Sequence, residues 1–235
     1  MSVRSVAAVP AVAPQPHACG PGRDLQDEAR GVFEATESHS ARVLLAAGSS
    51  SVIHDRALVG DPNGDTTVEV PVDTELLAAL ATRSGFPRGR TDRLTGPLAE
   101  LVRWSAHVAP GLPVLPVEVP AQASADTLAA VATGLRGATE ATDRQVGVVA
   151  VGDLARHTRQ AAPRAQDFDR DVCEALRRGD LAALGALGPG LAHDLEADGW
   201  APLMLAALLA EQAGLAYGDV HYLASDGAGH VVLCP

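Results

Sequence analysis

The amino-acid sequence predicts one α/β domain with a mostly parallel central sheet, flanking helices and a C-terminal β-hairpin. Two apolar runs, residues 42–47 (RVLLAA) and 145–151 (QVGVVAV), have the form of parallel strands buried on both faces. Segments with helical spacing alternate with such runs, which is typical of a sheet covered by helices. Residues 220–224 and 230–233 flank the turn Asp226-Gly227-Ala228-Gly229 and indicate the hairpin.

The N-terminal part of the chain predicts a strand, a loop and two helices. Residues 3–9 form the first expected strand, and residues 11–22, rich in proline and glycine, form a loop. Residues 25–37 repeat apolar side chains with helical spacing. Asp73 is a favourable N-cap for a helix that runs to about Arg83.

Two further N-cap residues, Thr95 and Ser124, predict the next two helices, and Pro97 in a first helical turn supports the earlier one. Between these helices, residues 112–119 (LPVLPVEV) have the composition of a strand. Because proline cannot donate a hydrogen bond to a neighbouring strand, the two prolines predict an edge or irregular strand.

The last third of the chain predicts a series of helices up to about residue 214. The pair Gly179-Asp180 has the residue types that end one helix and cap the next. Residues 200–209 are apolar on nearly all sides, so we expect a buried helix there. No linker or internal repeat divides residues 1–235, which favours a single domain.

Composition excludes several classes of function. The formal net charge is −11, and all 18 basic residues are arginine without a basic stripe, so we expect no binding to nucleic acid or anionic membranes. No apolar stretch approaches the roughly 20 residues of a membrane span. The three cysteines lack metal-knuckle or redox spacing, which favours a reduced, cytoplasmic setting. The alanine-rich, lysine-free composition is typical of a GC-rich bacterial genome, and residues 1–14, broken by two prolines, do not predict a signal peptide.

Three loops are the expected positions for a ligand site. Ligands of such sheets bind beyond the carboxyl ends of the strands. The loops at residues 10–22, 48–55 and 152–159 follow strands, and each contains a histidine: His17, His54 and His157. Imidazole binds metals and exchanges protons near neutral pH, so these three side chains are the first candidates for chemistry.

A series of short motifs carries a family resemblance. Residues 148–156 (VVAVGDLAR) resemble the strand and loop of class III extradiol ring-cleavage dioxygenases of the LigB type, where Gly-Asp-Leu-Ser-His or a close variant occurs. Phe168-Asp169-Arg170, Arg178-Gly179-Asp180-Leu181 and Glu196-Ala197-Asp198-Gly199 continue the series in order. With the closing hairpin, the resemblance to this family and to the related Memo-type proteins covers residues 95–235 well and the N-terminal third weakly.

The resemblance implies an Fe(II) site of two histidines and one carboxylate, with open positions for a catecholate and dioxygen. The first histidine would follow the first strand, where the nearest candidate is His17. The second would stand at Ser50, four residues before His54, and the carboxylate at Trp200. The altered positions predict that iron is not held in the family's manner. Fe(II) or another divalent cation on displaced ligands, His17 and His54, stays as the alternative to no cofactor.

The resemblance also implies a histidine that acts as acid or base on the substrate. Its position is occupied by Arg156, and His157 is adjacent, so His157 is the candidate catalytic residue. Ser50, Asp153 and Arg156 are expected to line the same pocket, although Asp153 could equally cap the following helix.

Three functional hypotheses remain open. The leading one is a divergent extradiol dioxygenase-like protein of unknown activity without the intact iron site. The second is an active enzyme on a small aromatic, catechol-type substrate, with ligands repositioned at His17, His54 and His157. The third is a non-catalytic binding or assembly protein, which would include a homo-oligomer. The other histidines are expected to be structural, and Asp167, Asp169 and Asp171 to form a solvated charged face.

Overall fold

Ten strands and six labelled helices make up the described part of the chain. The computed structural model describes residues 3–9, 30–34, 39–60, 67–84, 86–89, 93–158, 162–215, 219–225 and 227–234. The strands are β1 (Val3–Val9), β2 (Ala41–Gly48), β3 (Val52–His54), β4 (Ala57–Gly60), β5 (Thr67–Val70), β6 (Arg88–Gly89), β7 (Val114–Pro120), β8 (Val146–Val151), β9 (Asp219–Ser225) and β10 (Ala228–Cys234). The helices are α2 (Thr74–Ser84), α3 (Gly96–Val108), α4 (Ala125–Ala141), α5 (Ala162–Arg178), α6 (Leu181–Asp194) and α7 (Trp200–Ala213).

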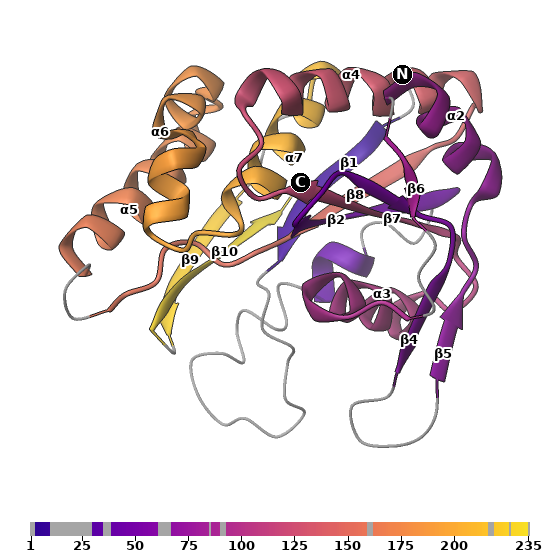
Figure 1. The fold of residues 1–235 in the computed structure, drawn as a ribbon, viewed down its shortest axis with the longest axis horizontal. Helices are drawn as coiled ribbons and strands as arrows, with labels where there is room; N and C mark the ends of the chain where they lie inside the picture. Colours follow the sequence, from indigo (N-terminus) through magenta and orange to yellow (C-terminus); the bar gives the residue numbers. More distant parts are fainter. Residues whose placement is uncertain are drawn as a thin grey trace.

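An eight-stranded sheet forms the centre of the molecule, in the order β6-β3-β7-β2-β8-β1-β10-β9 (Figure 1). The four strands β7, β2, β8 and β1 are mutually parallel, and β10 continues the sheet antiparallel to β1. The two apolar runs of the sequence are direct neighbours, with Val43 opposite Val148. The fold class is confirmed, including the C-terminal hairpin of β9 and β10.

The strand with two prolines lies inside the sheet, so of the two predicted alternatives, an edge or an irregular strand, the edge strand was wrong. β7 pairs with β2 along its whole length and with β3 only opposite Val117 and Glu118. Val114 donates its N–H to the carbonyl of Pro71, away from β2. Pro116 lies two residues further along and faces the same side as Val114. Proline has no N–H, and at this position an N–H would point to a place where β3 does not pair, so no hydrogen bond between strands is lost.

Another expectation also changes in this region: residues 48–55 are not entirely loop, because they contain β3. A second, two-stranded sheet of β4 and β5 follows, and no sequence pattern had indicated it. Of the expected helix at residues 25–37, residues 30–34 are helical and the remainder lies outside the described residues.

Three of the four predicted N-caps use their side chains. Asp73 accepts from the Leu76 N–H at 2.9 Å, Ser124 from the Thr127 N–H at 3.2 Å, and Asp180 from the Ala183 N–H at 2.9 Å. Thr95 stands at the start of α3 without a capping bond from its side chain. Among the helices of the described chain, none is long and apolar enough to cross a membrane.

Helices cover both faces of the sheet, as predicted. α2, α4 and α7 pack on one face and α3 on the other, while α5 and α6 extend the first layer over the hairpin (Figure 1). α7 lies against β1, β2, β7 and β8, and its residues are buried on nearly all sides. Trp200 at its first turn is 0% exposed, and its indole N–H donates to the Leu184 carbonyl at 3.2 Å.

Two glycines allow the chain to cross itself where β8 ends and α7 begins. A Cβ at Gly152 would lie 2.1 Å from the Gly199 Cα, closer than atoms can approach. The Gly199 N–H donates to the Asp153 carbonyl at 2.7 Å, which fixes the crossing. The close approach directs the chain after β8 away from α7 and toward the hairpin.

Gly152→Ala should therefore destabilise the protein by at least about 1–3 kcal/mol, the usual cost of overpacking, because backbone atoms cannot move aside as a side chain can. Gly190→Ala is the matched control, since a Cβ there meets nothing within 4 Å. Urea unfolding monitored by circular dichroism measures both. Equal free energies of unfolding for the two variants would show that the crossing is not a tight constraint.

Candidate functional site

The segment after β8 is held against the start of β10 by backbone hydrogen bonds. Leu154 N–H donates to the Gly229 carbonyl at 2.8 Å, and Gly229 N–H donates to the Ala155 carbonyl at 3.1 Å. His157 N–H donates to the Gly227 carbonyl at 2.7 Å. These bonds place His157 beside the hairpin and below α5, so it does not project over the end of the parallel strands.

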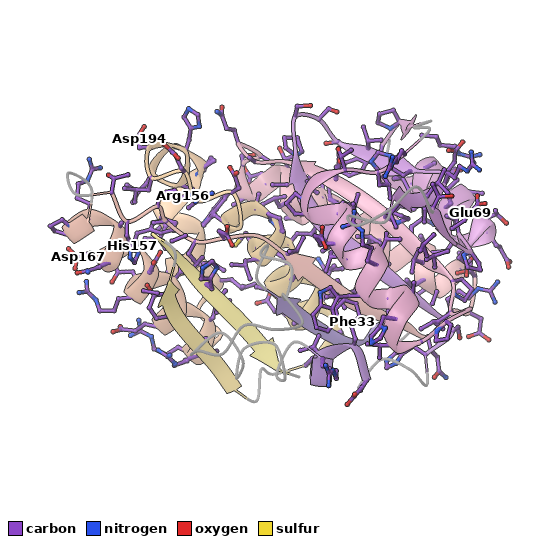
Figure 2. All side chains as sticks on the ribbon, turned by 90° about the horizontal axis from the view of Figure 1, so that it is seen from below. Phe33, Glu69, Arg156, His157, Asp167 and Asp194 are labelled. Atoms are coloured by element: carbon purple, nitrogen blue, oxygen red, sulfur yellow. The ribbon has the colours of Figure 1, made fainter. Side chains whose placement is uncertain are left out.

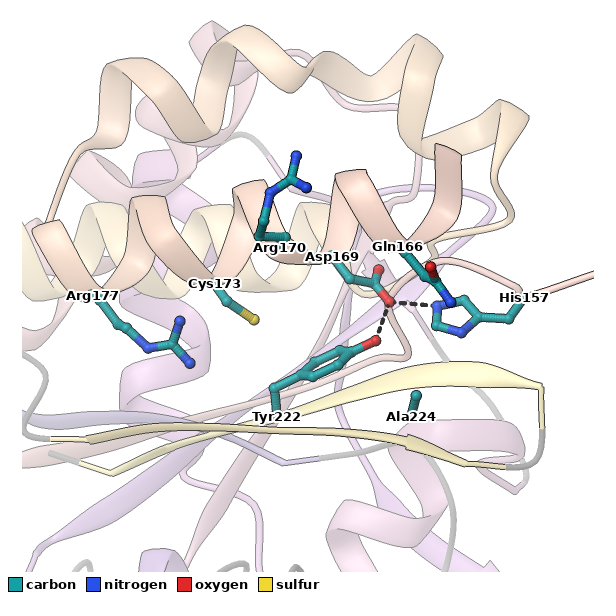
Figure 3. A pocket seen from close by; sticks show the side chains of 8 residues that line it. All are labelled: His157, Gln166, Asp169, Arg170, Cys173, Arg177, Tyr222 and Ala224. Carbon is teal, nitrogen blue, oxygen red and sulfur yellow. Dashed lines mark hydrogen bonds and ion pairs between the residues drawn. The ribbon is translucent and has the colours of Figure 1, made fainter. Parts of the chain in front are cut away.

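A buried carboxylate, that of Asp169 on α5, receives three hydrogen bonds at this place. Ala155 N–H donates to Oδ1 at 2.9 Å, and the His157 Nε2 and the Tyr222 hydroxyl meet Oδ2 at 2.7 Å and 2.8 Å (Figure 3). Asp169 is 1% exposed. A buried carboxylate needs several donors because it has lost its water, and here two chain segments supply them, the segment after β8 and the hairpin.

The contact with Asp169 determines which nitrogen of His157 is available. Since a carboxylate only accepts hydrogen bonds, Nε2 carries the proton in this pair. Within the described residues, no hydrogen bond engages Nδ1 of the same ring. In the neutral ring Nδ1 is therefore an acceptor, and the ring borders a cavity.

The cavity lies between α5 and β9 and has a volume of about 340 Å³. Its lining comes from three places, the segment after β8, one stripe of α5 and one face of β9 (Figure 3). The lining residues are His157, Gln166, Asp169, Arg170, Cys173, Arg177, Tyr222 and Ala224. Glycine at position 229 is required, because a Cβ there would lie 2.0 Å from Asp169 Oδ2.

Two weakly acidic groups in the cavity are kept protonated at neutral pH. Burial raises the pKa of the Cys173 thiol to about 11; Arg177 opposes this shift and Asp169 adds to it. Burial also raises the pKa of Tyr222, and its hydrogen bond to Asp169 raises it further. The tyrosine residue as a whole is 37% exposed, but its hydroxyl end is turned inward to Asp169 (Figure 3).

Asp169 corrects the expectation of a solvated acidic face. Its neighbours Asp167 and Asp171 are exposed and pair with Arg170, as that expectation requires. Asp169 instead lies in the buried stripe of α5, between Ala165 and Cys173 in helical spacing. A carboxylate within an apolar stripe was the signal that could have identified it, because such a group requires partners.

His54, a predicted metal ligand, lies near the edge of the sheet opposite to the β9–β10 hairpin. It ends β3, is 7% exposed, and has Nε2 at 3.5 Å from Glu118 Oε1. Neither ring nitrogen has a hydrogen-bond partner in the described part of the chain. Glu118 in turn lies across Gly48, at the carboxyl end of β2, where a Cβ would be 2.7 Å from its Oε2.

The other predicted pocket residues are dispersed. Asp153 Oδ1 is in hydrogen-bond contact with His230 Nδ1 at 3.0 Å, and the residues after Asp153 are not helical, so it caps no helix. Arg156 is exposed and forms a backbone bridge to Ala228, and Ser50 is exposed. His17 lies outside the described residues.

His54 and His157 do not share a site. β3, which carries His54, and β10, beside which His157 lies, are five strand positions apart in the sheet. At about 4.8 Å per strand this amounts to roughly 24 Å. Figure 2 shows His157 near the hairpin, at the opposite end of the molecule from Glu69.

The described residues do not fit the iron set that the resemblance implies. Trp200 occupies the expected carboxylate position and is directed into the core toward Leu184, and Ser50 is a neutral hydroxyl. Within the ranges that the structure describes, no group of three or more His, Cys, Asp or Glu residues could hold a metal ion.

Comparison with known proteins gives the fold and no function. No protein-family model matches the chain, and no curated protein matches it. The solved structure of the uncharacterized protein JW3007 from Escherichia coli K12 is similar, with a TM-score of 0.63 and 12% sequence identity. The match covers 98% of this chain and 100% of that chain. At this identity the likeness concerns the architecture alone.

The contact between Asp169 and Tyr222 predicts an unusual tyrosine titration. The chain has two tyrosines, so Tyr217→Phe leaves Tyr222 as the only one. Ultraviolet difference absorbance should then give a midpoint clearly above pH 10, roughly the value of a free tyrosine. Asp169→Asn should lower that midpoint but not restore it, because burial is the larger cause of the raised pKa.

Asp167→Asn is the control, one carboxylate removed from the same helix without contact to Tyr222. Because the pKa of Tyr222 is raised in the folded state, its contribution to stability is complete below about pH 10 and is lost above it. An unchanged midpoint in Asp169→Asn would contradict the assigned bond.

Proposed function

We propose that the protein is a divergent class III extradiol dioxygenase-like protein that does not carry out the family's iron-dependent ring cleavage. The architecture supports descent from such a fold, since a mostly parallel sheet with a C-terminal hairpin is what the motif series implied. The argument against the family's chemistry comes from the side chains at the expected ligand positions.

The position of Trp200 carries the proposal. The iron set needs an anionic carboxylate that partly neutralises the dication and leaves coordination positions open. At the corresponding place this chain has an indole that is 0% exposed and donates its N–H to the Leu184 carbonyl. Moving that ring aside for a ligand would break a buried hydrogen bond and open a cavity in the core.

The remaining expected ligands weaken the case for iron further. Ser50 offers only a neutral hydroxyl on an exposed turn. His157 is bound to Asp169 beside the hairpin and is remote from His54. A site built from His17, His54 and His157 together is therefore not proposed.

A rebuilt metal site around His54 is the second candidate, and one observation favours it. A buried imidazole with both nitrogens unbonded is uncommon, because buried polar atoms normally have partners. With Glu118 Oε1 at 3.5 Å, His54 provides one imidazole and one carboxylate, two of the three donors of a facial triad. Within the described residues no third ligand completes the set, and His17, the other predicted ligand, lies outside them. A metal held there would supply a Lewis acid at the carboxyl end of β7.

Metal binding separates the two candidates. Purified protein is incubated anaerobically with Fe(II), desalted and subjected to elemental analysis, in parallel with an absorbance assay for cleavage of catechol. We expect clearly less than one equivalent of iron and no cleavage product, because two of the three family ligands are replaced.

His54→Ala and Glu118→Gln test the second candidate, with His193→Ala as the control because His193 is exposed on α6. The leading proposal predicts the same low iron content in all four proteins. One equivalent of iron that is lost in the first two variants and kept in the control would establish the rebuilt site and refute the leading proposal.

A further inference from the structure

One stripe of α5 faces the hairpin and forms the upper wall of the cavity. Asp169, Cys173 and Arg177 follow one another at intervals of four residues and all line it. Tyr222 and Ala224, two residues apart on β9, form the opposite wall. The cavity is thus elongated along the helix, with His157 at one end and Arg177 toward the other (Figure 3).

The charges at the cavity differ in how fully they are compensated. Asp169 is satisfied by three donors within the protein. Arg170 pairs with Asp167 and Asp171 on the outer side of α5. Arg177 makes one hydrogen bond, from Nη2 to the Val220 carbonyl at 3.2 Å. Among the side chains that the structure describes, no carboxylate pairs with Arg177, so its remaining N–H groups are available to an anion.

The middle of the cavity is neutral. The Cys173 thiol stays protonated because burial raises its pKa to about 11. The Tyr222 ring presents a flat apolar surface, since its hydroxyl is already used by Asp169. A hydrocarbon segment would lie here without leaving a charged group unpaired.

At the other end, His157 offers an acceptor. Its Nε2 is held by Asp169 at 2.7 Å, which fixes the ring and leaves Nδ1 for a ligand O–H or N–H. The arrangement that holds the ring is part of the protein, so the acceptor is oriented before a ligand arrives.

The length of α5 sets the size of a matching ligand. Eight residues separate Asp169 from Arg177, about 12 Å at about 1.5 Å per residue. A helical side chain leans toward the N-terminus of its helix, which brings the guanidinium nearer to Asp169 by several ångströms. A molecule with polar groups somewhat less than about 12 Å apart would therefore reach from Arg177 toward the His157 end.

We propose that the cavity between α5 and β9 binds a small organic carboxylate whose far end carries a hydroxyl or amino group. The carboxylate pairs with Arg177, the hydrocarbon part lies between Cys173 and Tyr222, and the far end donates to Nδ1 of His157. The site is separate from the strand-end positions considered above and does not depend on whether those hold a metal.

6-Hydroxyhexanoate is a probe of the required length, and protein-observed NMR detects its binding even when it is weak. Arg177→Gln should weaken binding about fivefold, the effect of losing the roughly 1 kcal/mol of an exposed ion pair. Arg178→Gln is the matched control, because Arg178 is the next residue, is also exposed and pairs with Glu174 outside the cavity. Its affinity should stay within about twofold of the unmodified protein, since it does not line the cavity.

Two further probes test the ends of the ligand. 6-Aminohexan-1-ol, which has no carboxylate, should bind at least about fivefold more weakly than 6-hydroxyhexanoate, because it has no anionic group to pair with Arg177. Hexanoate, which lacks the hydroxyl, should bind about threefold more weakly, as expected for one neutral hydrogen bond, and should leave the His157 ring resonances unshifted.

Each other outcome overturns a defined part of the proposal. Absence of binding by 6-hydroxyhexanoate, or equal losses in Arg177→Gln and Arg178→Gln, excludes the cavity as an anion site. Equal affinities for hexanoate and 6-hydroxyhexanoate exclude the role of His157.

Discussion

The buried carboxylate of Asp169 connects the three parts of the chain that form the cavity between α5 and β9. It joins α5 to the segment after β8 through Ala155 and His157, and to the hairpin through Tyr222. Backbone hydrogen bonds already hold the segment after β8 against the hairpin, and the carboxylate adds side-chain contacts that fix the orientation of the His157 and Tyr222 rings. Because the carboxylate has lost its hydration, the three donors are mutually dependent, and the absence of a side chain at position 229 makes room for the group that they surround.

A second constraint, the crossing of Gly152 and Gly199, explains why the strand-end positions carry little chemistry. The crossing brings the start of α7 directly beneath the end of β8. Trp200 then enters the core and is completed by a hydrogen bond to Leu184. The chain after β8 runs to the hairpin, and this course places His157 beside the hairpin. These backbone contacts therefore place His157, the candidate catalytic residue, at the cavity between α5 and β9 and not at the end of the parallel strands.

The fold of this protein does not by itself indicate a function. The architecture is similar to that of an uncharacterized Escherichia coli protein at 12% identity, and such a likeness transfers no activity. The net charge of the chain and the local charge of Arg177 have different effects on which ligands it can bind. The net charge of −11 repels anions at long range, but screening limits that field to about 8 Å at physiological ionic strength. A single arginine with available donors, Arg177, can then determine the sign of charge that its own cavity accepts.

The sequence by itself determined the long strands and most of the helices, but not the short strands β3 to β6. The runs at residues 42–47 and 145–151, the caps at Asp73 and Ser124, and the burial of α7 were all predictable, because side-chain periodicity and cap chemistry act over a few residues. The tertiary structure alone decided which histidine meets which carboxylate. Asp169 takes one partner 12 residues away and another 53 residues away. Those meetings depend on strand order and on where the chain crosses itself, which no local pattern encodes.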